Sequence, residues 1–261
     1  MRYLKLYSHF VRFSFSKAFQ FRLDFFFRIF MDVIFYIVNI LFFKVIFLHS
    51  TLIGGWNEPQ VTVFICGYLL MDSIYMTIFS NNLWWFPFYI NKGDLDYYLI
   101  RPVSSLFFLT MRDFAANSFM NLLLAIALFV WSLFSYPGLI VPWKLILYIL
   151  LIVNGAILYS IFYLFAVIPV FWTKSPRGLA ELYWKASHLG ERPDHIYKGL
   201  FKRILTTIFP MAIIASYPAR IFLNDFDPWI LFNIILVTIF SGVTLVFLWR
   251  KALKSYTSAS S

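Results

Sequence analysis

Six long apolar runs divide this chain, and they constrain its fold more than any other feature. The runs cover residues 25–48, 61–79, 106–134, 143–172, 204–223 and 229–249. An α-helix rises about 1.5 Å per residue, so about 20 apolar residues cross a hydrocarbon core of about 30 Å. The sequence therefore predicts an all-α integral membrane protein with six transmembrane helices in a single domain over residues 1–261.

The composition supports a membrane protein and argues against other classes. Hydrophobic residues make up 61% of the chain and charged residues 13%, whereas soluble domains carry about 25% charged residues. The net charge is +10, but the basic residues lie between the apolar runs rather than in one patch, so we expect no nucleic-acid partner. The four histidines and the single cysteine have no metal-binding spacing, and no nucleophile–base pair appears. We therefore expect neither a metal site nor an enzyme.

The N-terminal residues predict a helix that lies along the membrane surface. On a helical wheel, Arg2, Lys5, His9 and Arg12 fall on one narrow face of residues 2–22, and apolar side chains cover the other side. A basic amphipathic helix of this kind lies in the interface between lipid and water. We expect it to precede the first span.

The basic residues also predict the orientation. Of the 22 lysines and arginines, 19 fall at the N-terminus, around residues 92–112, in the 173–203 segment and at the C-terminus. Because cytoplasmic loops carry the excess of lysine and arginine, both termini are expected in the cytoplasm.

Several polar residues interrupt the predicted spans. Asp72 lies near the middle of the second run, where an ionised carboxylate costs on the order of 2.5–3.5 kcal/mol. It either lines a substrate pathway or is a hydrogen-bonded carboxyl inside the bundle. Asn117 and Asn121 lie one turn apart in the third run, and we expect them to bind a neighbouring helix. In the first run, Asp32 follows Asp24 and Arg28 at helical spacing, which predicts pairing along one helix face.

The 91–102 segment, Asn-Lys-Gly-Asp-Leu-Asp-Tyr-Tyr-Leu-Ile-Arg-Pro, is the most informative polar stretch. Gly93 suits the end of one helix and Asp94 the N-cap of the next. Asp96 falls in the first turn, where its charge meets the helix dipole. Pro102 disfavours helical geometry at Arg101 and ends the segment. We predict a short helix over residues 93–101, although an ordinary polar turn has the same local chemistry.

One face of this predicted helix is apolar. Leu95, Tyr98 and Leu99 share it and are expected to form a small knob. The cation pattern places the knob in the cytoplasm.

Short motifs along almost the whole chain resemble ABC-2-type transporter permeases, and more narrowly the bacterial "ABC-2 family transporter protein" subfamily. The motifs are Ile53-Gly54-Gly55-Trp56, Gly93-Asp94-Leu95-Asp96 with Arg101-Pro102, Phe171-Trp172-Thr173, and the series Pro193, Ile196-Tyr197, Pro210 and Pro218-Ala219. Each is short, but their order and spacing together make the resemblance fairly specific.

The resemblance implies an exporter permease of the ABC-2 (type V-like) fold in the bacterial inner membrane. Two such subunits, identical or paired with a sister permease, would form a pathway at their interface above two cytoplasmic ATPase subunits. The 93–101 helix would be the coupling helix, with the Leu95, Tyr98 and Leu99 knob in a groove of the ATPase and Asp94, Asp96 and Arg101 at its rim. ATP and Mg²⁺ would bind the partner, because this chain has no GxxxxGK[ST] loop and needs no cofactor itself. The alternative is an ATP-independent membrane scaffold or lipid scramblase.

The 173–203 segment leaves two topologies open. Hydropathy favours a cytoplasmic loop there, with a helix over 177–189, followed by a fifth span over 204–223. The family architecture instead favours 196–223, split at Pro210, as an external pair of re-entrant helices, with 177–189 as part of the fifth span. We adopt the hydropathic assignment as the expectation.

Overall fold

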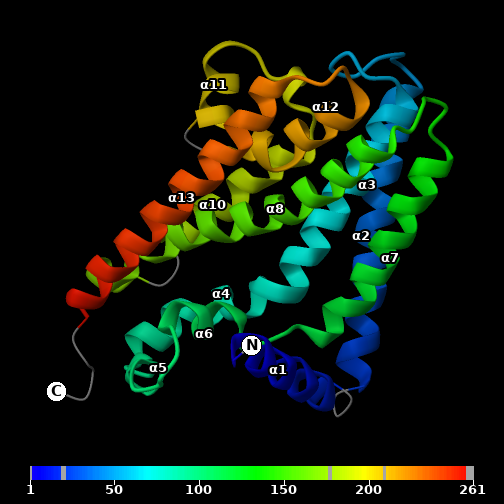
Figure 1. Ribbon diagram of the computed structural model, residues 1–261. Helices are drawn as coiled ribbons and strands as arrows, with labels where there is room; N and C mark the ends of the chain where they lie inside the picture. Colours follow the sequence, from blue (N-terminus) through cyan, green and yellow to red (C-terminus); the bar gives the residue numbers. More distant parts are fainter. Residues whose placement is uncertain (1, 19–21, 176–177, 208–209, 257–261) are drawn as a thin grey trace.

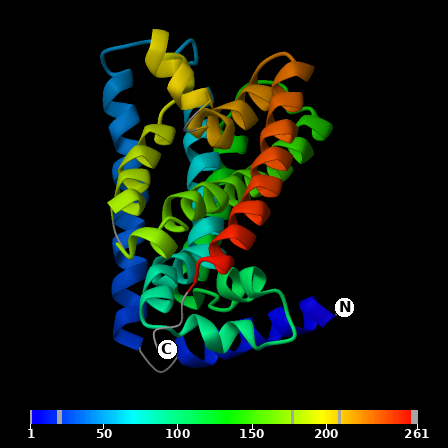
Figure 2. The ribbon, with the colours of Figure 1, turned by 90° about the vertical axis from the view of Figure 1, so that its left-hand side faces the viewer.

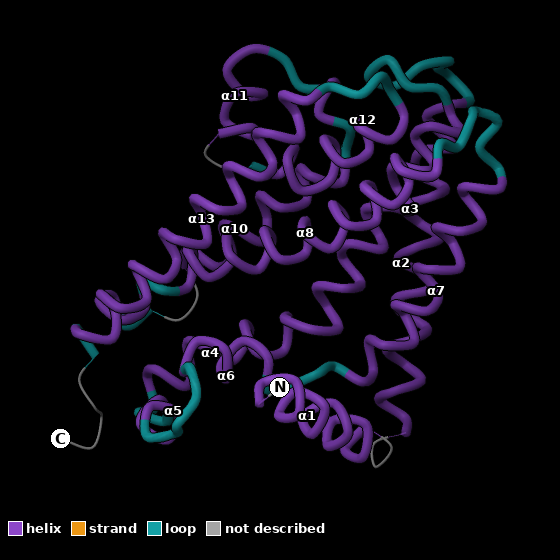
Figure 3. Tube along the Cα trace, viewed as in Figure 1, coloured by secondary structure: helices purple, strands orange, loops and turns teal. Residues whose placement is uncertain are grey.

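The computed structural model describes residues 2–18, 22–175, 178–207 and 210–256. The described residues form helices and loops, and no strand occurs among them (Figure 3). Five helical segments are long and apolar enough to cross a membrane: Ile29–Phe47, Glu58–Asn91, Ala116–Phe134, Pro142–Thr173 and Pro228–Lys254. The chain is therefore a multi-pass membrane protein, in agreement with the predicted class.

The helix bundle has two distinct ends (Figures 1 and 2). We call the end that carries α1 (Arg2–Ala18) the lower end, and the end that carries the 48–57 loop the upper end. Helix α1 lies across the lower end, as the view turned by 90° also shows (Figure 2). Its Tyr3 and Phe10 rings pack edge-on against Phe107 and Phe108 at 4.8 and 5.2 Å between centroids. Helix α2 (Arg22–Phe47) then runs to the upper end.

The second long segment is the centre of the bundle. Helix α3 (Glu58–Tyr75) continues through the π-helix η1 (Met76–Ser80) into α4 (Asn81–Asn91), well beyond the predicted end at residue 79. Of the most apolar 18-residue stretch of this segment, 72% is buried within the chain, against 11% of the corresponding stretch of α2. Asn57 and Gln60 form a capping box that starts α3. The central position of α3 makes it the element on which the other spans pack.

The predicted third span is wrong at its start. Helix α5 (Leu95–Leu99) and helix α6 (Ser105–Met111) stay at the lower end, and only α7 (Ala116–Phe134) crosses. The break at residues 112–115 is held by α3–α4 polar groups. Asn82 exchanges two hydrogen bonds with the Asp113 backbone at 2.8 and 2.9 Å, and Ala115 N–H donates to the Thr77 carbonyl at 2.8 Å. Such partners stabilise an extended backbone that hydropathy reads as helix.

Helix α8 (Pro142–Val167) returns to the lower end and is followed by the short α9 (Val170–Thr173). The lower end of α8–α9 is fixed by two hydrogen bonds, from Asn91 to the Lys174 carbonyl at 3.2 Å and from Trp172 to Ser255 at 3.0 Å. Helix α10 (Gly178–Ser187) then rises along α8, where the Tyr159 hydroxyl donates to Ser187 at 2.8 Å.

Residues 192–227 lie at the upper end, and this corrects the adopted topology. Two 3₁₀ turns (His188–Glu191 and Asp194–Ile196) lead to α11 (Gly199–Thr207), followed by a π-helical turn (Ala212–Ser216) and α12 (Tyr217–Leu223). Trp56 contacts both ends of this stretch, with the His195 ring 6.1 Å away and its indole N–H 3.2 Å from the Asn224 amide oxygen. A segment that starts and finishes beside one residue does not cross the bundle.

The expected fifth span over 204–223 is therefore wrong, as is the placement of all of 173–203 in a loop at the cytoplasmic end. The segment 212–223 is also shorter than the five long apolar segments. Its apolar character has another cause, because Ile213, Ile214 and Ile221 are buried within the chain rather than facing lipid. Arg192, Lys198, Lys202 and Arg203 move to the upper end, which reduces but does not reverse the excess of cations at the lower end. Helix α13 (Pro228–Lys254) finally returns to the lower end.

Candidate functional site

The 91–102 segment forms a compact corner at the lower end (Figure 1). Gly93 ends α4 with φ 82°, a left-handed conformation that favours glycine, as predicted. Asp94 occupies the N-cap position of α5, but its side chain makes no capping hydrogen bond, so the predicted cap is wrong in that respect. Asp96 lies in the first turn as expected. The helix is shorter than predicted and ends at Leu99, three residues before Pro102.

The structure contradicts the predicted apolar knob. Leu95 and Tyr98 are 0% and 4% exposed, and both belong to the hydrophobic core. The Tyr98 ring lies 5.5 Å from those of Tyr89 and Phe108, and its hydroxyl accepts a hydrogen bond from the Arg112 guanidinium. Leu95 and Tyr98 therefore attach α5 to the rest of the chain.

The exposed apolar face of this corner is different. It consists of Tyr97, Leu99 and Ile100, which are 53%, 39% and 79% exposed. We call these three residues the α5 patch. Arg101 stacks on the Tyr97 ring at 4.3 Å from its centroid and donates to its hydroxyl. Sequence reasoning missed Tyr97 and Ile100 because five residues of helix are too few for periodicity to identify the buried side.

Tyr256, which follows α13, joins the same corner. Burial, together with the nearby Asp96 carboxylate, raises the pKa of the Tyr256 phenol to about 12. The Tyr256 ring also packs against Phe171, with 6.1 Å between centroids. The end of α13, α9 and α5 are therefore linked through one aromatic side chain.

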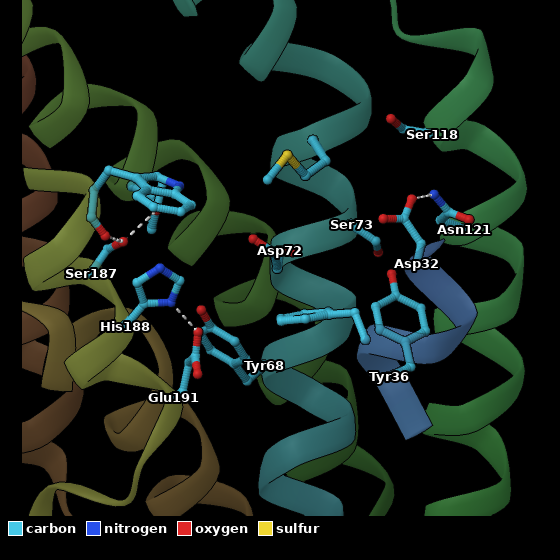
Figure 4. A pocket seen from close by; sticks show the side chains of 14 residues that line it. Asp32, Tyr36, Tyr68, Asp72, Ser73, Ser118, Asn121, Ser187, His188 and Glu191 are labelled. Atoms are coloured by element: carbon cyan, nitrogen blue, oxygen red, sulfur yellow. Dashed lines mark hydrogen bonds and ion pairs between the residues drawn. The ribbon is translucent and has the colours of Figure 1, made fainter. Parts of the chain in front are cut away.

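A second group of polar residues surrounds a cavity of about 270 Å³ in the middle of the bundle (Figure 4). Asp72 projects from α3, with His188 and Glu191 on one side and Asp32 and Asn121 on the other. Three carboxyl groups face this cavity, and no lysine or arginine is among its described lining residues.

The structure brings only some of the predicted polar residues together. Asp72 and Asn121 line the cavity, whereas Asn117 is partly buried and is not among the described lining residues. Asn121 contacts a neighbouring helix, because its amide donates to Asp32 of α2. The side chains of Asp24 and Arg28, expected to pair with Asp32, lie outside the described residues.

Sequence reasoning missed Glu191 and His188, whose side chains pair at 2.6 Å beside Asp72. Both lie in the stretch assigned to a cytoplasmic loop. The signal was the spacing of three residues between them, which puts both on one face of a helical turn.

Residues 33–260 match the family described as "ABC-2 family transporter protein". The chain belongs to this family. Comparisons with curated proteins and with solved structures give no match. The ABC-2 family transporter proteins are membrane components of ABC transporters, and the five apolar spans of this chain agree with that role.

The two candidate sites of this ABC-2 family protein lie at different levels of the bundle. Membership in this family implies association with ATP-binding subunits and with a membrane. The lower end carries α1, the α5 corner and the end of α13. The cavity around Asp72 lies between the ends, among the spans themselves.

Proposed function

We propose that this chain is the permease subunit of an ATP-binding-cassette exporter in a bacterial cell membrane. It would form the translocation pathway as a dimer with an identical or sister permease. Two separate cytoplasmic ATPase subunits would supply the energy, with ATP and Mg²⁺ bound to them and no cofactor on this chain. The family membership over residues 33–260 is the observation that carries the proposal.

The proposed topology has six crossings. Five of them are the long apolar segments. The remaining crossing, which comes between α9 and α13 in the chain, is the shorter α10 with the following 3₁₀ turn. It connects Lys174 at the lower end to His195 at the upper end. The larger share of the cations at the lower end supports a cytoplasmic location for that end and for both termini. Residues 192–227 would then be extracellular, and α1 would lie in the cytoplasmic interface.

The α5 patch is the proposed contact with the ATPase. Its apolar side chains project from the lower end, and the exposed Lys92, Asp94 and Arg101 surround them. An apolar centre with a charged rim is typical of a protein interface. This assignment replaces Leu95 and Tyr98 by Tyr97 and Ile100 and keeps Leu99 as the shared residue.

The structure supports a route by which motion of α5 would reach the spans. The guanidinium of Arg112, between α6 and α7, lies 5.4 Å from the centroid of the Tyr98 ring of α5 and 3.8 Å from Asp113. The Asp113 backbone is hydrogen-bonded to Asn82 of α4, which continues into α3. A displacement of α5 by the ATPase would thus act on the central helix rather than on one loop.

Co-purification tests the proposed function. The chain is co-expressed with the ABC ATPase encoded beside it, purified through a tag on the chain, and assayed for ATP hydrolysis in nanodiscs. We expect the ATPase to co-purify and the Ile100→Asp variant to lose it. An ATP-independent scaffold or scramblase would purify alone and leave ATP hydrolysis unchanged.

A further inference from the structure

The cavity around Asp72 is acidic and has aromatic walls. Asp32, Asp72 and Glu191 face it against a single imidazole, that of His188. Aromatic rings complete the lining, from Phe35, Tyr36, Tyr68, Tyr159 and Trp184. Carboxylates attract cations, and the faces of aromatic rings bind ammonium groups. An anionic ligand would be repelled.

One oxygen of a residue that lines the cavity lacks a partner among the described residues. Asn121 is 3% exposed, and its amide oxygen accepts no hydrogen bond although its nitrogen donates to Asp32. The Asp72 carboxyl faces the cavity, and Glu191 beside it is paired with His188. A buried polar atom left unpaired costs about 1–3 kcal/mol, so such atoms indicate a missing partner.

An apolar pocket adjoins this cavity. Its volume is about 550 Å³, and Met76 and Trp184 line both spaces. Apart from Ser80, Asn81 and Glu181, its lining is aromatic or aliphatic, including Tyr75, Trp84, Pro87, Phe88 and Tyr163. The two spaces together run along one side of α3, η1 and α4, with the acidic part beside α3 and the apolar part beside η1 and α4.

The π-helical turn η1 lies where the two spaces meet. It begins at Met76, which lines both, and includes Ser80 of the apolar pocket. A π-turn inside an α-helix costs stability and is frequent at functional sites. On its two sides, Asp72 of α3 lines the acidic cavity and Trp84 of α4 lines the apolar pocket.

We propose that these two spaces form one binding site for a single-chain amphiphilic amine, with its ammonium group among Asp72, Asp32 and Glu191 and its hydrocarbon chain beside Trp84 and Phe88. A metal ion fits less well, since no group of three His, Cys, Asp or Glu side chains among the described residues is placed to hold one. This proposal rests on the proposed exporter function, because the bound amine would be the substrate that the exporter transports.

Binding of tritiated octylamine to the full chain in phosphatidylglycerol nanodiscs tests the site without any ATPase. Empty nanodiscs provide the background. Unlabelled octylamine should displace the tritiated ligand at least about tenfold more effectively than octanol or octanoate does, because only the amine is a cation. Butylamine should compete more than about tenfold less well than unlabelled octylamine, because a short chain leaves the apolar pocket unfilled.

Three variants assign the two halves of the site. Asp72→Asn should weaken octylamine binding about tenfold or more, whereas Asp225→Asn, an exposed carboxylate at the upper end, should not change it. Ser80→Phe should fill part of the apolar pocket and remove the advantage of octylamine over butylamine while keeping the preference for a cation. If Asp72→Asn does not fold, Glu191→Gln serves in its place.

The result that overturns the proposal is equal competition by octanol and octylamine, or wild-type binding by a folded Asp72→Asn variant. Either result would leave co-purification of the ATPase, and hence the proposed function, untouched. A repeat in phosphatidylethanolamine nanodiscs against phosphatidylcholine nanodiscs, two lipids without net charge of which only the first has a primary amine, identifies the source of the amine. Unchanged octylamine binding supports a free amphiphile, and weaker binding supports the same amine site occupied by a lipid headgroup.

Discussion

The Asp194 carboxylate lies 3.5 Å from the guanidinium of Arg220, and this pair holds the upper-end segment against itself. The Lys202 ammonium approaches the same carboxylate at 3.4 Å, and the Asp194 side chain is only 2% exposed. Asp194 precedes α11, Lys202 lies within it and Arg220 lies in α12. One carboxylate thus joins the start, middle and end of a stretch that would otherwise be connected by loops.

Removal of this carboxylate should destabilise the protein. Breaking a buried ion pair by loss of one partner costs about 3–5 kcal/mol, and Asp194→Asn should lie near the lower value because Lys202 and Arg220 are partly exposed. Thermal unfolding in nanodiscs measures the effect, with Asp225→Asn as the control that changes the same charge on an exposed side chain. An Asp194→Asn midpoint equal to that of the control would contradict the structural role of the pair.

The position of residues 192–227 can be measured by cysteine labelling. Cys66 is buried, so Cys66→Ala provides a background in which single cysteines are placed at exposed sites. With the upper end outside, a membrane-impermeant maleimide applied to intact cells should modify Lys198→Cys and Leu139→Cys but not Lys174→Cys. Labelling of Lys198→Cys only after the cells are opened would instead support the hydropathic topology, with a fifth span over 204–223.

The α5 corner predicts two opposite kinds of variant. Ile100→Asp changes an exposed side chain, so we expect a stability change within about 0.5 kcal/mol and a loss of ATPase binding. Leu95→Ala removes a fully buried side chain and should cost about 2–5 kcal/mol of stability. Co-purification and thermal unfolding, measured together, separate a docking residue from a core residue. If Leu95→Ala loses the ATPase at unchanged stability, the ATPase binds the Leu95, Tyr98 and Leu99 face predicted from the sequence instead of the α5 patch.

Stability should fall in mild acid because of His195. Burial lowers the pKa of its imidazole, the Asp194 carboxylate opposes this, and the Arg220 and Lys202 cations lower it further. The unfolded chain, with a histidine pKa of about 6.5, therefore binds more protons than the folded chain just below that pH, and unfolding becomes easier as pH falls. The loss ends once pH drops below the folded pKa.

The measurement for His195 is the thermal midpoint between pH 8 and pH 5, on wild type and on His195→Gln. We expect the variant to lose part of the pH dependence, whereas His9→Gln, an exposed histidine on α1, keeps it. Identical pH profiles for wild type and His195→Gln would show that this histidine is protonated alike in both states.

Much of the fold could be predicted because the lipid-facing helices carry a strong signal. Helix α2, the α8–α9 segment and α13 follow the apolar runs within a few residues, since their outward faces meet lipid or a partner. The predictions failed where apolar residues are buried by the chain itself. Ile214 and Ile221 lie inside the 192–227 segment, and α6 holds Phe108 against α1 and α5 at the lower end. Hydropathy shows that a side chain is apolar, but it does not show whether that side chain contacts lipid or other parts of the protein.

The candidate site was predictable in its positions but not in its partners. Gly93 and Asp96 follow from local backbone preferences, and Asp72 from the cost of a charge in the bilayer. Which side of α5 is buried depends on Arg112, which reaches Tyr98 from fourteen residues away. The cavity needs Glu191 beside Asp72, a long-range contact that no local pattern in one sequence reveals.

Gly155 tests the packing of the 192–227 segment against α8. A methyl group at this position would lie 2.6 Å from the Ile214 carbonyl oxygen and 3.2 Å from Met71. Because the closest atom belongs to the backbone, it has little freedom to move aside, and we expect Gly155→Ala to destabilise the protein by about 1–3 kcal/mol. Gly242→Ala on α13 is the matched control, since nothing lies within 4 Å of its added methyl group and alanine is the better helix former. Thermal unfolding should therefore shift in opposite directions for the two variants, and a stabilised Gly155→Ala would mean that α8 and the 192–227 segment do not approach this closely.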